Sequence, residues 1–402
     1  MDPHYQLDLL GGLIQRDIAI EVVAGDSMAQ AEVVKAKNVT YLNFRGDQNP
    51  RAPALVKMAR VLKYYARLLQ YAMTTDSRVF HIQWPNKFKY FDRTWLNLFY
   101  KCLGKKLVFT AHNVNAGVRD GTDSFLNRFT LRCQYCMADH IIVHTSRLKQ
   151  ELVDSFRQPP GKISVIPHGL NTVVLGHSQT RQSARQSLGL GPRQKVLLFF
   201  GNILPYKGLE HLIAALGLLV VQGWTDLRVI IAGRASANQA YWQSIQDRIR
   251  KGRLEAYLLQ KIEFIPDSAI EILFKAADGL VLPYKYSTQS GPLFIAYAYG
   301  LPVIATDVGS FREDVVELKT GLICQPENPD DLASAIRRYF ESSLYRDLDH
   351  RRQIIQDYAN ERYSWTKVGQ MTAEVYSQVL PDGHGRKPQP VNPDTLKANK
   401  TI

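Results

Sequence analysis

Short apolar runs rich in β-branched residues alternate with longer helical patterns along most of the 402-residue chain. An apolar run without polar alternation suits a strand that is buried on both faces, as in a parallel sheet covered by helices. The pattern therefore predicts repeated β/α units. In the first half, the predicted strands are residues 18–24, 39–44, 79–84, 106–112, 140–145 and 163–168.

A polar stretch at residues 175–194 interrupts this alternation and predicts a linker with a short helix. The alternation then resumes, with predicted strands at 195–201, 227–233, 261–267, 279–284, 301–308 and 321–326. Two such series predict an α/β protein of two doubly wound, Rossmann-like domains that face a central cleft. We expect a first domain at 1–175, a second at 176–360, a C-terminal helix at 361–380 and a disordered tail at 381–402.

The beginning of the chain departs from this plan. A helix is predicted at about residues 5–15, before any strand, whereas a doubly wound domain normally opens with a strand. Two interpretations remain open. Either the first strand is missing and Met1 lies downstream of the true start, or the sheet begins one strand later.

The composition is that of a soluble globular protein, with 45% apolar and 22% charged residues. No run approaches the roughly 20 apolar residues of a membrane span, and the start lacks the pattern of a signal peptide. Four scattered cysteines do not suggest a disulfide framework, so a reducing cytoplasm is expected. Cys133 and Cys136 form an isolated CxxC pair for which core packing is predicted.

Positive charge is concentrated in one quarter of the chain. Residues 51–150 hold 17 Lys and Arg against 5 Asp and Glu, while the whole chain has a net charge of +13. This asymmetry favours contact with an anionic partner, and no recognisable nucleic-acid-binding module is present. A basic amphipathic helix at 56–73 can lie on an anionic membrane; a core-facing helix with a solvated basic side is the alternative. Its basic residues are Lys57, Arg60, Lys63 and Arg67.

Two strand-to-helix turns in the second half carry candidate chemistry. In the first turn, Gly201 ends a predicted strand and Lys207-Gly208 precede a helix. Glycines allow close backbone approach, and a helix N-terminus favours a phosphate, so Lys207 would add positive charge at an anion site. An ordinary turn is the alternative.

The second turn is Gln289-Ser290-Gly291-Pro292, which opens a short apolar helix. Ser290 suits the N-cap, and Pro292 suits the first helical turn. This helix starts beyond the carboxyl end of a strand, where open α/β sheets bind ligands. Two such sites in one domain suit a nucleotide diphosphate. A tight turn at 308–310 then precedes Glu313.

Two polar features lie outside these turns. His112 follows the predicted strand at 106–112, where it could hydrogen-bond a sugar hydroxyl, although a single histidine is often structural. Asp347-Leu348-Asp349 is the only Asp-x-Asp, and it lies in a charged helical stretch that predicts a solvated face rather than a metal site.

Taken together, the motifs resemble the donor domain of retaining glycosyltransferase family 4, over about residues 195–335. The matching positions, in order, are Gly201, Lys207-Gly208, Gly233, the run from Gly300 to Thr306, Gly309, Glu313 and Gly321. The segments TAHN and ISVIPHG resemble the acceptor domain and interdomain linker of the same family.

The chain departs from the family pattern at three positions. The usual arginine of the first loop is Asn202, and the usual pair of glutamates falls on Ser287 and Ile295. The Pro-Tyr strand end at Tyr284 and the Gln-Ser-Gly element resemble instead a branch associated with bacterial surface polysaccharides.

The resemblance implies a GT-B enzyme that transfers a hexose, with retention, from a nucleotide-diphosphate sugar to a glycan or lipid-linked acceptor. It implies no metal and no cofactor beyond that sugar nucleotide, and a cytoplasmic, membrane-peripheral location. The alternatives are a catalytically degenerate relative that binds a glycan or partner, and a nucleotide-sugar epimerase, for which no carboxylate pair was identified. The implied catalytic residues are His112 and Lys207, and the implied donor-binding residues are Gly201, Asn202, Gly208, Gly233, Tyr284, Gln289, Ser290, Gly291 and Glu313.

Overall fold

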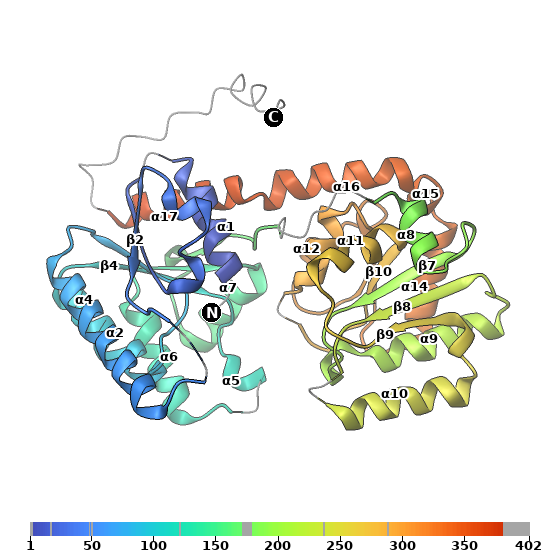
Figure 1. Ribbon diagram of the computed structural model, residues 1–402, viewed down its shortest axis with the longest axis horizontal. Helices are drawn as coiled ribbons and strands as arrows, with labels where there is room; N and C mark the ends of the chain where they lie inside the picture. The colour runs from blue at the N-terminus through green and yellow to red at the C-terminus, as the bar shows by residue number, and fades with distance from the viewer. Residues whose placement is uncertain are drawn as a thin grey trace, which may run out of the picture.

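The computed structural model describes residues 3–16, 18–47, 49, 51–119, 122–170, 179–235, 238–287 and 289–380. Figure 1 shows two lobes side by side, with the helices α16 and α17 running from the second lobe back to the first. The first lobe contains α1 (Pro3–Ile14), β1 (Ile20–Ala24), β2 (Val39–Asn43), α2 (Ala54–Thr74), β3 (Val79–Ile82), α3 (Lys89–Phe91), the π-helical turn η3 (Asp92–Leu96), α4 (Asn97–Cys102), β4 (Lys106–Ala111), α5 (Ala116–Arg119), α6 (Phe125–Met137), β5 (His140–Val143), α7 (Ser146–Phe156) and β6 (Ile163–Val165).

The second lobe repeats the alternation of strand and helix. It contains α8 (Arg181–Ser187), β7 (Lys195–Phe200), the 3₁₀ turn η5 (Pro205–Lys207), α9 (Leu209–Val221), β8 (Leu227–Ala232), α10 (Gln239–Gly252), β9 (Leu258–Lys261), α11 (Asp267–Ala276), β10 (Gly279–Leu282), α12 (Gly291–Ala298), β11 (Val303–Thr306), α13 (Phe311–Asp314), β12 (Gly321–Cys324), α14 (Pro329–Glu341), α15 (Ser343–Arg346) and α16 (Leu348–Tyr363). The last helix is α17 (Trp365–Val379).

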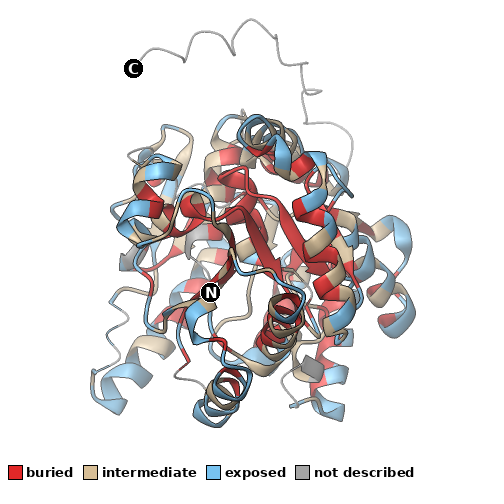
Figure 2. Cartoon of the chain, turned by 90° about the vertical axis from the view of Figure 1, so that its right-hand side faces the viewer, coloured by how far each residue is buried: buried red, intermediate tan, exposed pale blue. Residues whose placement is uncertain are grey.

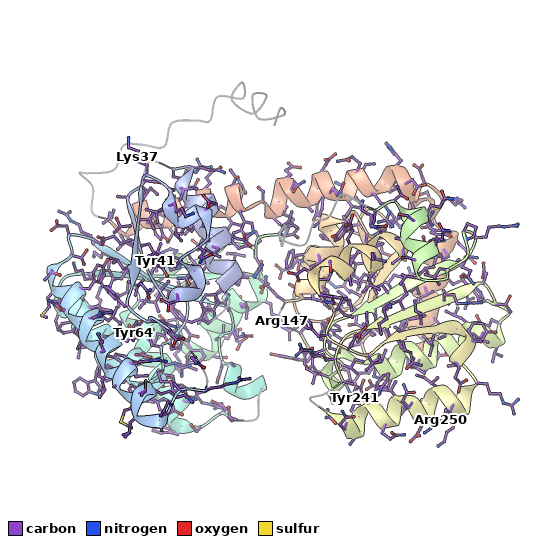
Figure 3. All side chains as sticks on the ribbon, in the orientation of Figure 1. Lys37, Tyr41, Tyr64, Arg147, Tyr241 and Arg250 are labelled. Carbon is purple, nitrogen blue, oxygen red and sulfur yellow. The ribbon has the colours of Figure 1, made fainter. Side chains whose placement is uncertain are left out.

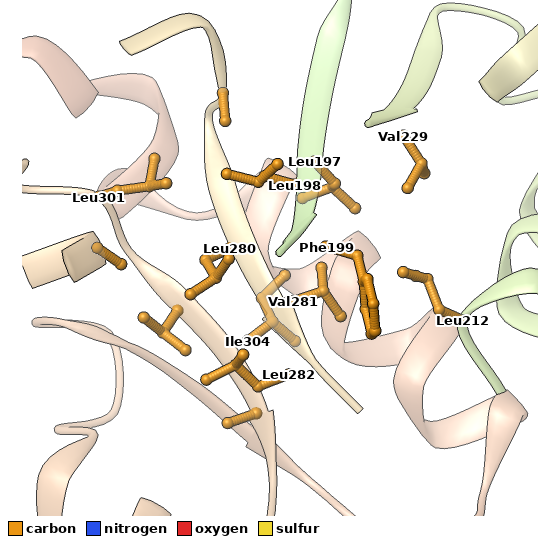
Figure 4. Close-up of a cluster of buried hydrophobic side chains, with 14 of the residues drawn as sticks. Leu197, Leu198, Phe199, Leu212, Val229, Leu280, Val281, Leu282, Leu301 and Ile304 are labelled. Atoms are coloured by element: carbon orange, nitrogen blue, oxygen red, sulfur yellow. The ribbon is translucent and has the colours of Figure 1, made fainter. Parts of the chain in front are cut away.

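The second-lobe sheet has six parallel strands in the order β12-β11-β10-β7-β8-β9. This is the 3-2-1-4-5-6 order of the classic doubly wound sheet, with β7 as the first strand. Its centre is fully apolar: Leu197, Leu198 and Phe199 of β7 are at most 1% exposed, and they pack with neighbours from β8, β10 and α9 (Figure 4). In Figure 2 the strands are red, while the outer faces of the helices are pale blue.

The first-lobe strands form two separate sheets. One contains β1 and β2, and the other contains β3-β4-β5-β6, with parallel pairing in both. The predicted α/β architecture of two Rossmann-like lobes is confirmed, but the predicted single first sheet is divided.

The C-terminal helices tie the lobes together. α16 packs on α12, whereas α17 crosses over and packs on α1. Gly12 and Gly369 allow this close crossing, because a Cβ on Gly12 would lie 2.0 Å from the Trp365 carbonyl oxygen. The chain's last described helix therefore belongs, by packing, to the first lobe.

The structure corrects some sequence expectations. The strand predicted at 261–267 is wrong: β9 covers Leu258–Lys261, since these residues pair with β8, and Pro266 instead leads into α11. Core packing of the CxxC pair is also wrong in part, because Cys136 is exposed at the end of α6. Asp347 precedes α16, as expected for a helical stretch. The predicted tail at 381–402 and part of the predicted linker lie outside the described residues.

Candidate functional site

Three glycines bring the loop after β7 against neighbouring strands. Gly201, Gly208 and Gly233 all have positive φ angles, of 111°, 65° and 145°. A Cβ would lie 2.1 Å from the Gly201 carbonyl oxygen if placed on Gly233, and 2.0 Å from the Pro283 oxygen if placed on Gly208. Only glycine fits such positions. The loop is therefore folded tightly over the carboxyl ends of β7, β8 and β10.

Lys207 is a buried cation at the centre of this loop. Its side chain is packed over the ring of Tyr284 at 5.4 Å, and the residue is only 8% exposed. The Nζ atom lies 2.6 Å from the position that a Cβ on Gly201 would occupy. Within the described residues, no hydrogen bond or ion pair reaches this ammonium group. Burial lowers its pKa to about 8, because desolvation penalises the charged form.

The start of α12 lies beside Lys207. A Cβ on Gly201 would also be 3.9 Å from Pro292, the second residue of that helix. Ser290 occupies the N-cap position, as predicted, and its side chain makes no capping bond. The buried hydroxyls of Ser290 and Tyr284 lie near each other, and neither forms a hydrogen bond of good geometry with a described residue.

The remaining predicted donor residues have different settings. Gly291 is exposed, with open space where a Cβ would be, and Gln289 is half-buried, with its carbonyl oxygen accepting a 2.9 Å hydrogen bond from the Ser287 hydroxyl. Asn202 is exposed at the mouth of the loop. Lys207 and the start of α12 thus place positive charge and free backbone N–H groups close together, an arrangement that suits a diphosphate.

In the first lobe, four adjacent strands end in ring-bearing residues. Trp84 follows β3, His112 follows β4, His144 follows β5, and His168 follows β6. The indole of Trp84 stacks on His112 with the ring planes 9° apart and the centroids separated by 4.3 Å. Parallel register places Ala111 opposite Val143, so the histidines that follow them are also neighbours.

A chain of hydrogen bonds fixes the tautomer of His112. His144 Nδ1 is 2.9 Å from the Ile166 carbonyl oxygen, which can only accept, so His144 donates there. Its Nε2 then accepts the Nδ1 proton of His112 across 3.0 Å. Burial lowers the pKa of His112 to about 2 and that of His144 to about 3, which keeps both rings neutral. His112 Nε2 is therefore a buried acceptor that has no partner among the described residues.

The carboxyl ends of the two sheets meet through this cluster of rings. His168 stacks on Phe294 of α12 with centroids 5.6 Å apart, and it also contacts Tyr5 and Trp365. The start of the second-lobe helix and the first-lobe histidines therefore belong to one continuous region.

A second interlobe contact involves Glu313. Its half-buried carboxylate accepts a 3.1 Å hydrogen bond from the backbone N–H of Ser146, at the start of α7. The neighbouring residue Arg147 lies between the lobes in Figure 3. The Arg312 guanidinium lowers the pKa of Asp307, and Arg147 adds to this effect from the other lobe. A basic side chain thus faces the second lobe from the first.

The basic helix predicted at 56–73 is α2, and its charged residues differ in environment. Lys57 and Lys63 are exposed, whereas Arg60 forms an ion pair with Asp47 at 3.0 Å and Arg67 donates to the Asn43 carbonyl oxygen. Among the described residues, no helix combines the length and the apolar character needed to cross a bilayer. Within the same ranges, no three His, Cys, Asp or Glu side chains gather in a way that could hold a metal ion.

Each lobe matches a different glycosyltransferase family model. Residues 4–174 match the model described as Glycosyltransferase Family 4, and residues 180–361 match Glycosyl transferases group 1. The chain is a family 4-like GT-B protein.

Curated relatives of this GT-B protein match it over part of their length. An uncharacterized glycosyltransferase of Methanocaldococcus jannaschii, MJ1607, is 26% identical over 246 residues, which are 60% of each chain. A D-inositol 3-phosphate glycosyltransferase of Nocardia farcinica is 30% identical over 257 residues, or 62% of this chain and 55% of that protein. The alignments therefore span somewhat more than half the length of these relatives.

Solved structures share the fold over nearly the whole chain. Alr3699/HepE of Anabaena, in complex with UDP, aligns with a TM-score of 0.70 and 18% identity, covering 93% of this chain and 96% of that one. Sucrose-phosphate synthase of Thermosynechococcus elongatus aligns with a TM-score of 0.69 and 16% identity, covering 93% and 92%. At such identities the likeness establishes the GT-B fold.

Several residues of this region of the GT-B protein are not predicted by the motif analysis. Trp84, His144 and His168 support His112, and Tyr5 packs edge-on against its ring with centroids 4.7 Å apart. A sequence signal for the first three does exist, because each lies at the carboxyl end of a predicted strand of one sheet, where side chains gather. Tyr5 and Arg147 carry no comparable signal.

Proposed function

We propose that this protein is a retaining, metal-independent glycosyltransferase, which moves a hexose from a nucleotide-diphosphate sugar to a glycan or lipid-linked acceptor. Lys207 carries this proposal, since it is a buried cation with no anionic partner among the described residues, next to the open N-terminus of α12. A buried unpaired charge is costly unless a ligand compensates it. A diphosphate supplies the required negative charge at the required place.

The proposed reaction depends on stabilising the leaving diphosphate. As the bond between C1 of the sugar and the phosphate oxygen breaks, negative charge grows on the phosphates, and Lys207 and the N–H groups of α12 are placed to stabilise it. The acceptor oxygen bonds to C1 on the same face, and its proton passes to the leaving phosphate. No protein nucleophile and no metal ion take part in this scheme.

His112 is the proposed positioning group for the donor sugar. Its Nε2 atom is an unprotonated acceptor held in place by His144 and by the Trp84 ring. Such an atom accepts a hydrogen bond from a sugar hydroxyl at any pH at which the ring stays neutral. Because the hydrogen bond to His144 fixes the tautomer of His112, a sugar hydroxyl that contacts Nε2 must donate the hydrogen bond.

The nucleotide is best sought by binding. Solved neighbours of the same fold contain UDP and UDP-glucose, which makes uridine nucleotides the first candidates. We would measure thermal shifts with UDP, GDP, ADP and CMP, followed by the matching sugar nucleotides. A ligand at a hundredfold excess over its Kd stabilises the folded state by about 2.7 kcal/mol. One diphosphate family should raise the melting temperature.

Variants make this experiment specific to the site. Lys207→Ala should weaken binding of that diphosphate by about 1.5–3 kcal/mol, the scale of a charge-assisted hydrogen bond. Lys251→Ala, which removes an exposed lysine of α10, is the matched control and should bind normally. If no diphosphate shifts a folded sample, the protein is instead a degenerate GT-B relative that binds without turnover.

We further propose that the enzyme works at an anionic membrane surface and there supplies glycans for polysaccharide synthesis. Several large apolar side chains of the first lobe are exposed beside its basic residues: Leu55 of α2 is 80% exposed, Trp95 of η3 68% and Phe125 of α6 86%. These helices pack together at one end of the lobe (Figure 1). Exposed apolar patches rimmed by basic residues are typical of membrane contact.

Vesicle binding tests this surface. The protein should bind vesicles with anionic lipid and not neutral vesicles, and added salt should weaken binding. Replacing Lys57, Lys63 and Arg67 by glutamate should abolish binding. The matched control replaces Arg248, Lys251 and Arg253, which are exposed basic residues of the second lobe, and should bind as the parent does. Equal loss in both variants would contradict a specific surface.

A further inference from the structure

A half-buried carboxylate follows the loop that holds Lys207 (residues 201–208, the Lys207 loop). Glu210 is the second residue of α9, and its side chain is 16% exposed. Its Oε1 atom accepts a 2.8 Å hydrogen bond from Lys285 Nζ, and its Oε2 atom accepts a hydrogen bond from the Tyr241 hydroxyl. Burial alone would raise the pKa of Glu210, but the hydrogen bonds from these two donors lower it below its ordinary value. Glu210 is therefore an ionised carboxylate with both oxygens bonded.

The two partners of Glu210 come from different parts of the sheet. Tyr241 lies in the first turn of α10, which follows β8, and Lys285 follows β10. In Figure 3, Tyr241 lies at the end of α10 that is nearer to the first lobe. Since β7 lies between β8 and β10, one carboxylate joins the segments that follow three adjacent strands.

Lys285 is also held through its backbone. Its N–H donates a 2.8 Å hydrogen bond to the carbonyl oxygen of Tyr206, which directly precedes Lys207. The neighbouring Tyr284 ring meets the Tyr206 ring edge-on with centroids 6.2 Å apart, and the Lys207 ammonium group lies over that Tyr284 ring. The segment that leads toward α12 (residues 283–287, the β10 loop) is therefore attached to the Lys207 loop by backbone, ring and ion-pair contacts.

The charge of Glu210 is compensated within the protein. Lys285 supplies a cation, and the first turn of α9 places the carboxylate at the positive end of a helix dipole. The start of α12 is different, because its first turn contains no acidic residue and Ser290 makes no capping bond. The protein's own negative charge thus lies at the start of α9, and the start of α12 is left for a ligand.

We propose that Glu210 is a positioning residue of the donor site, which holds Lys285 and thereby fixes the β10 loop against the Lys207 loop. This inference rests on the proposed function, since it assumes that a diphosphate contacts both Lys207 and the start of α12. Glu210 itself does not touch the diphosphate. It sets the spacing at which the two phosphate-binding elements reach one ligand.

A direct role of Lys285 in phosphate binding leads to the opposite expectation. If the Lys285 ammonium group bound the phosphates, Glu210→Ala would release it and remove a nearby negative charge, so UDP would bind more tightly. If Glu210 is a positioning residue, the same variant should bind UDP about tenfold more weakly, the scale of one lost hydrogen bond. The sign of the change therefore separates the two roles.

Titration calorimetry with UDP is the first test. Glu210→Ala and Lys285→Met should each weaken binding about tenfold, and the double variant should also lose about tenfold, because all three remove the same link. Glu210→Gln keeps an acceptor oxygen and should retain most of the affinity. The matched control is Asp226→Ala, which removes the partner of Lys195 at the opposite end of β7 and should bind as the parent does. A double variant about a hundredfold weaker, or tighter binding by Glu210→Ala, would overturn the proposal.

Hydrogen exchange without ligand is the second test. The amide of residue 285 should exchange at least tenfold faster in Glu210→Ala than in the parent, because the β10 loop is held less firmly. The Leu280 amide of β10, which donates to the Pro302 carbonyl oxygen, should be unchanged and serves as the internal control. Unchanged exchange at residue 285, or equal acceleration at residue 280, would overturn the proposal. A parent protein that binds no nucleoside diphosphate would instead contradict the proposed function, and this outcome is distinct because the exchange test needs no ligand.

Discussion

At the centre of the second lobe, β7 is packed on both faces and paired on both edges, with Val196 to Phe199 at most 1% exposed. At the corresponding position of the first lobe there is a cavity, and β3 beside it is half-buried throughout. The residues of β3 are as apolar as those of most buried strands. Burial is therefore decided by the neighbouring strand as much as by the strand's own sequence.

The carboxyl ends of the two sheets also differ in the polar side chains that they bury. The first lobe buries neutral histidines that bond to one another, whereas the second buries a lysine that has no anionic partner among the described residues. The neutral rings of His112 and His144 need no counter-charge, whereas a bound anion would stabilise the buried ammonium group of Lys207. Under the proposed function, the first lobe would position a sugar hydroxyl and the second lobe would bind the phosphates.

Lowering the pH should produce the largest difference in stability between the two lobes. Burial lowers the pKa of His81 to about 4, of His144 to about 3 and of His112 to about 2, below the unfolded value near 6.5. Between these values the unfolded chain binds more protons, so stability falls as pH falls, by up to about 1.4 kcal/mol per pH unit for each histidine.

The second lobe serves as the comparison in that experiment, because His350 is exposed there and the half-buried His211 lies beside the Glu210 carboxylate. Buried Asp92 and Asp314, one in each lobe, have raised pKa values that act in the opposite direction in both. Hydrogen exchange between pH 8 and pH 5 should therefore show a large loss of protection in the first lobe only. Equal losses in the two lobes would contradict this account.

Alanine substitutions in equivalent strands of the two lobes should give a smaller difference in the free energy of unfolding. Leu282→Ala in fully buried β10 should cost about 2–5 kcal/mol. Ile82→Ala in β3 should cost less than half as much, since its side chain is only partly removed from water. Urea unfolding followed by exchange in each lobe measures both.

Alkaline pH should weaken diphosphate binding, because it removes the positive charge of Lys207 in the second lobe. The Lys207 pKa of about 8 means that the free protein loses this positive charge as pH rises above 8. Binding should then weaken by up to tenfold, about 1.4 kcal/mol, per pH unit, until the higher pKa of the bound state is reached. Titration calorimetry from pH 7 to pH 9.5 measures this slope. Lys207→Met should bind weakly and without the slope, and the same slope in that variant would exclude Lys207 as its source.

The smallest effect is expected where the lobes touch. Glu313→Ala removes the acceptor of the Ser146 N–H, a single hydrogen bond worth about 0.5–1.5 kcal/mol. Glu313→Gln keeps an acceptor oxygen and should have less effect. Calorimetric unfolding should show the two lobes melting further apart in Glu313→Ala. An unchanged profile would mean that this contact does not couple them.

The sequence predicts the β/α order well because buried parallel strands are continuous apolar runs, as in residues 106–111 and 303–306. It fails at β9, where Leu258 to Lys261 pair with β8 although the apolar pattern continues to Ile265. Strand pairing depends on residues that are distant in the sequence, so the local periodicity of apolar residues does not predict it. The same limit explains why the divided first sheet is not visible in the pattern.

For the candidate site, glycines are the most informative residues. Gly201, Gly208 and Gly233 have positive φ angles and close backbone contacts, which local motifs encode directly. The tautomer of His112 depends instead on His144 and on the Ile166 carbonyl, which are distant in sequence. The roles of Gln289 and Asn202 toward a donor stay predictions.

The two places where the backbone passes between lobes are fastened to each other. The Leu170 N–H donates to the Tyr363 carbonyl oxygen, and the Trp365 indole donates to the Leu170 carbonyl oxygen. Among the described residues, the two interlobe crossings of the chain are therefore joined to each other by hydrogen bonds at one place, where His168 contacts both Phe294 and Trp365. Removing α17 would take away the Trp365 indole and leave the Leu170 carbonyl oxygen without that donor.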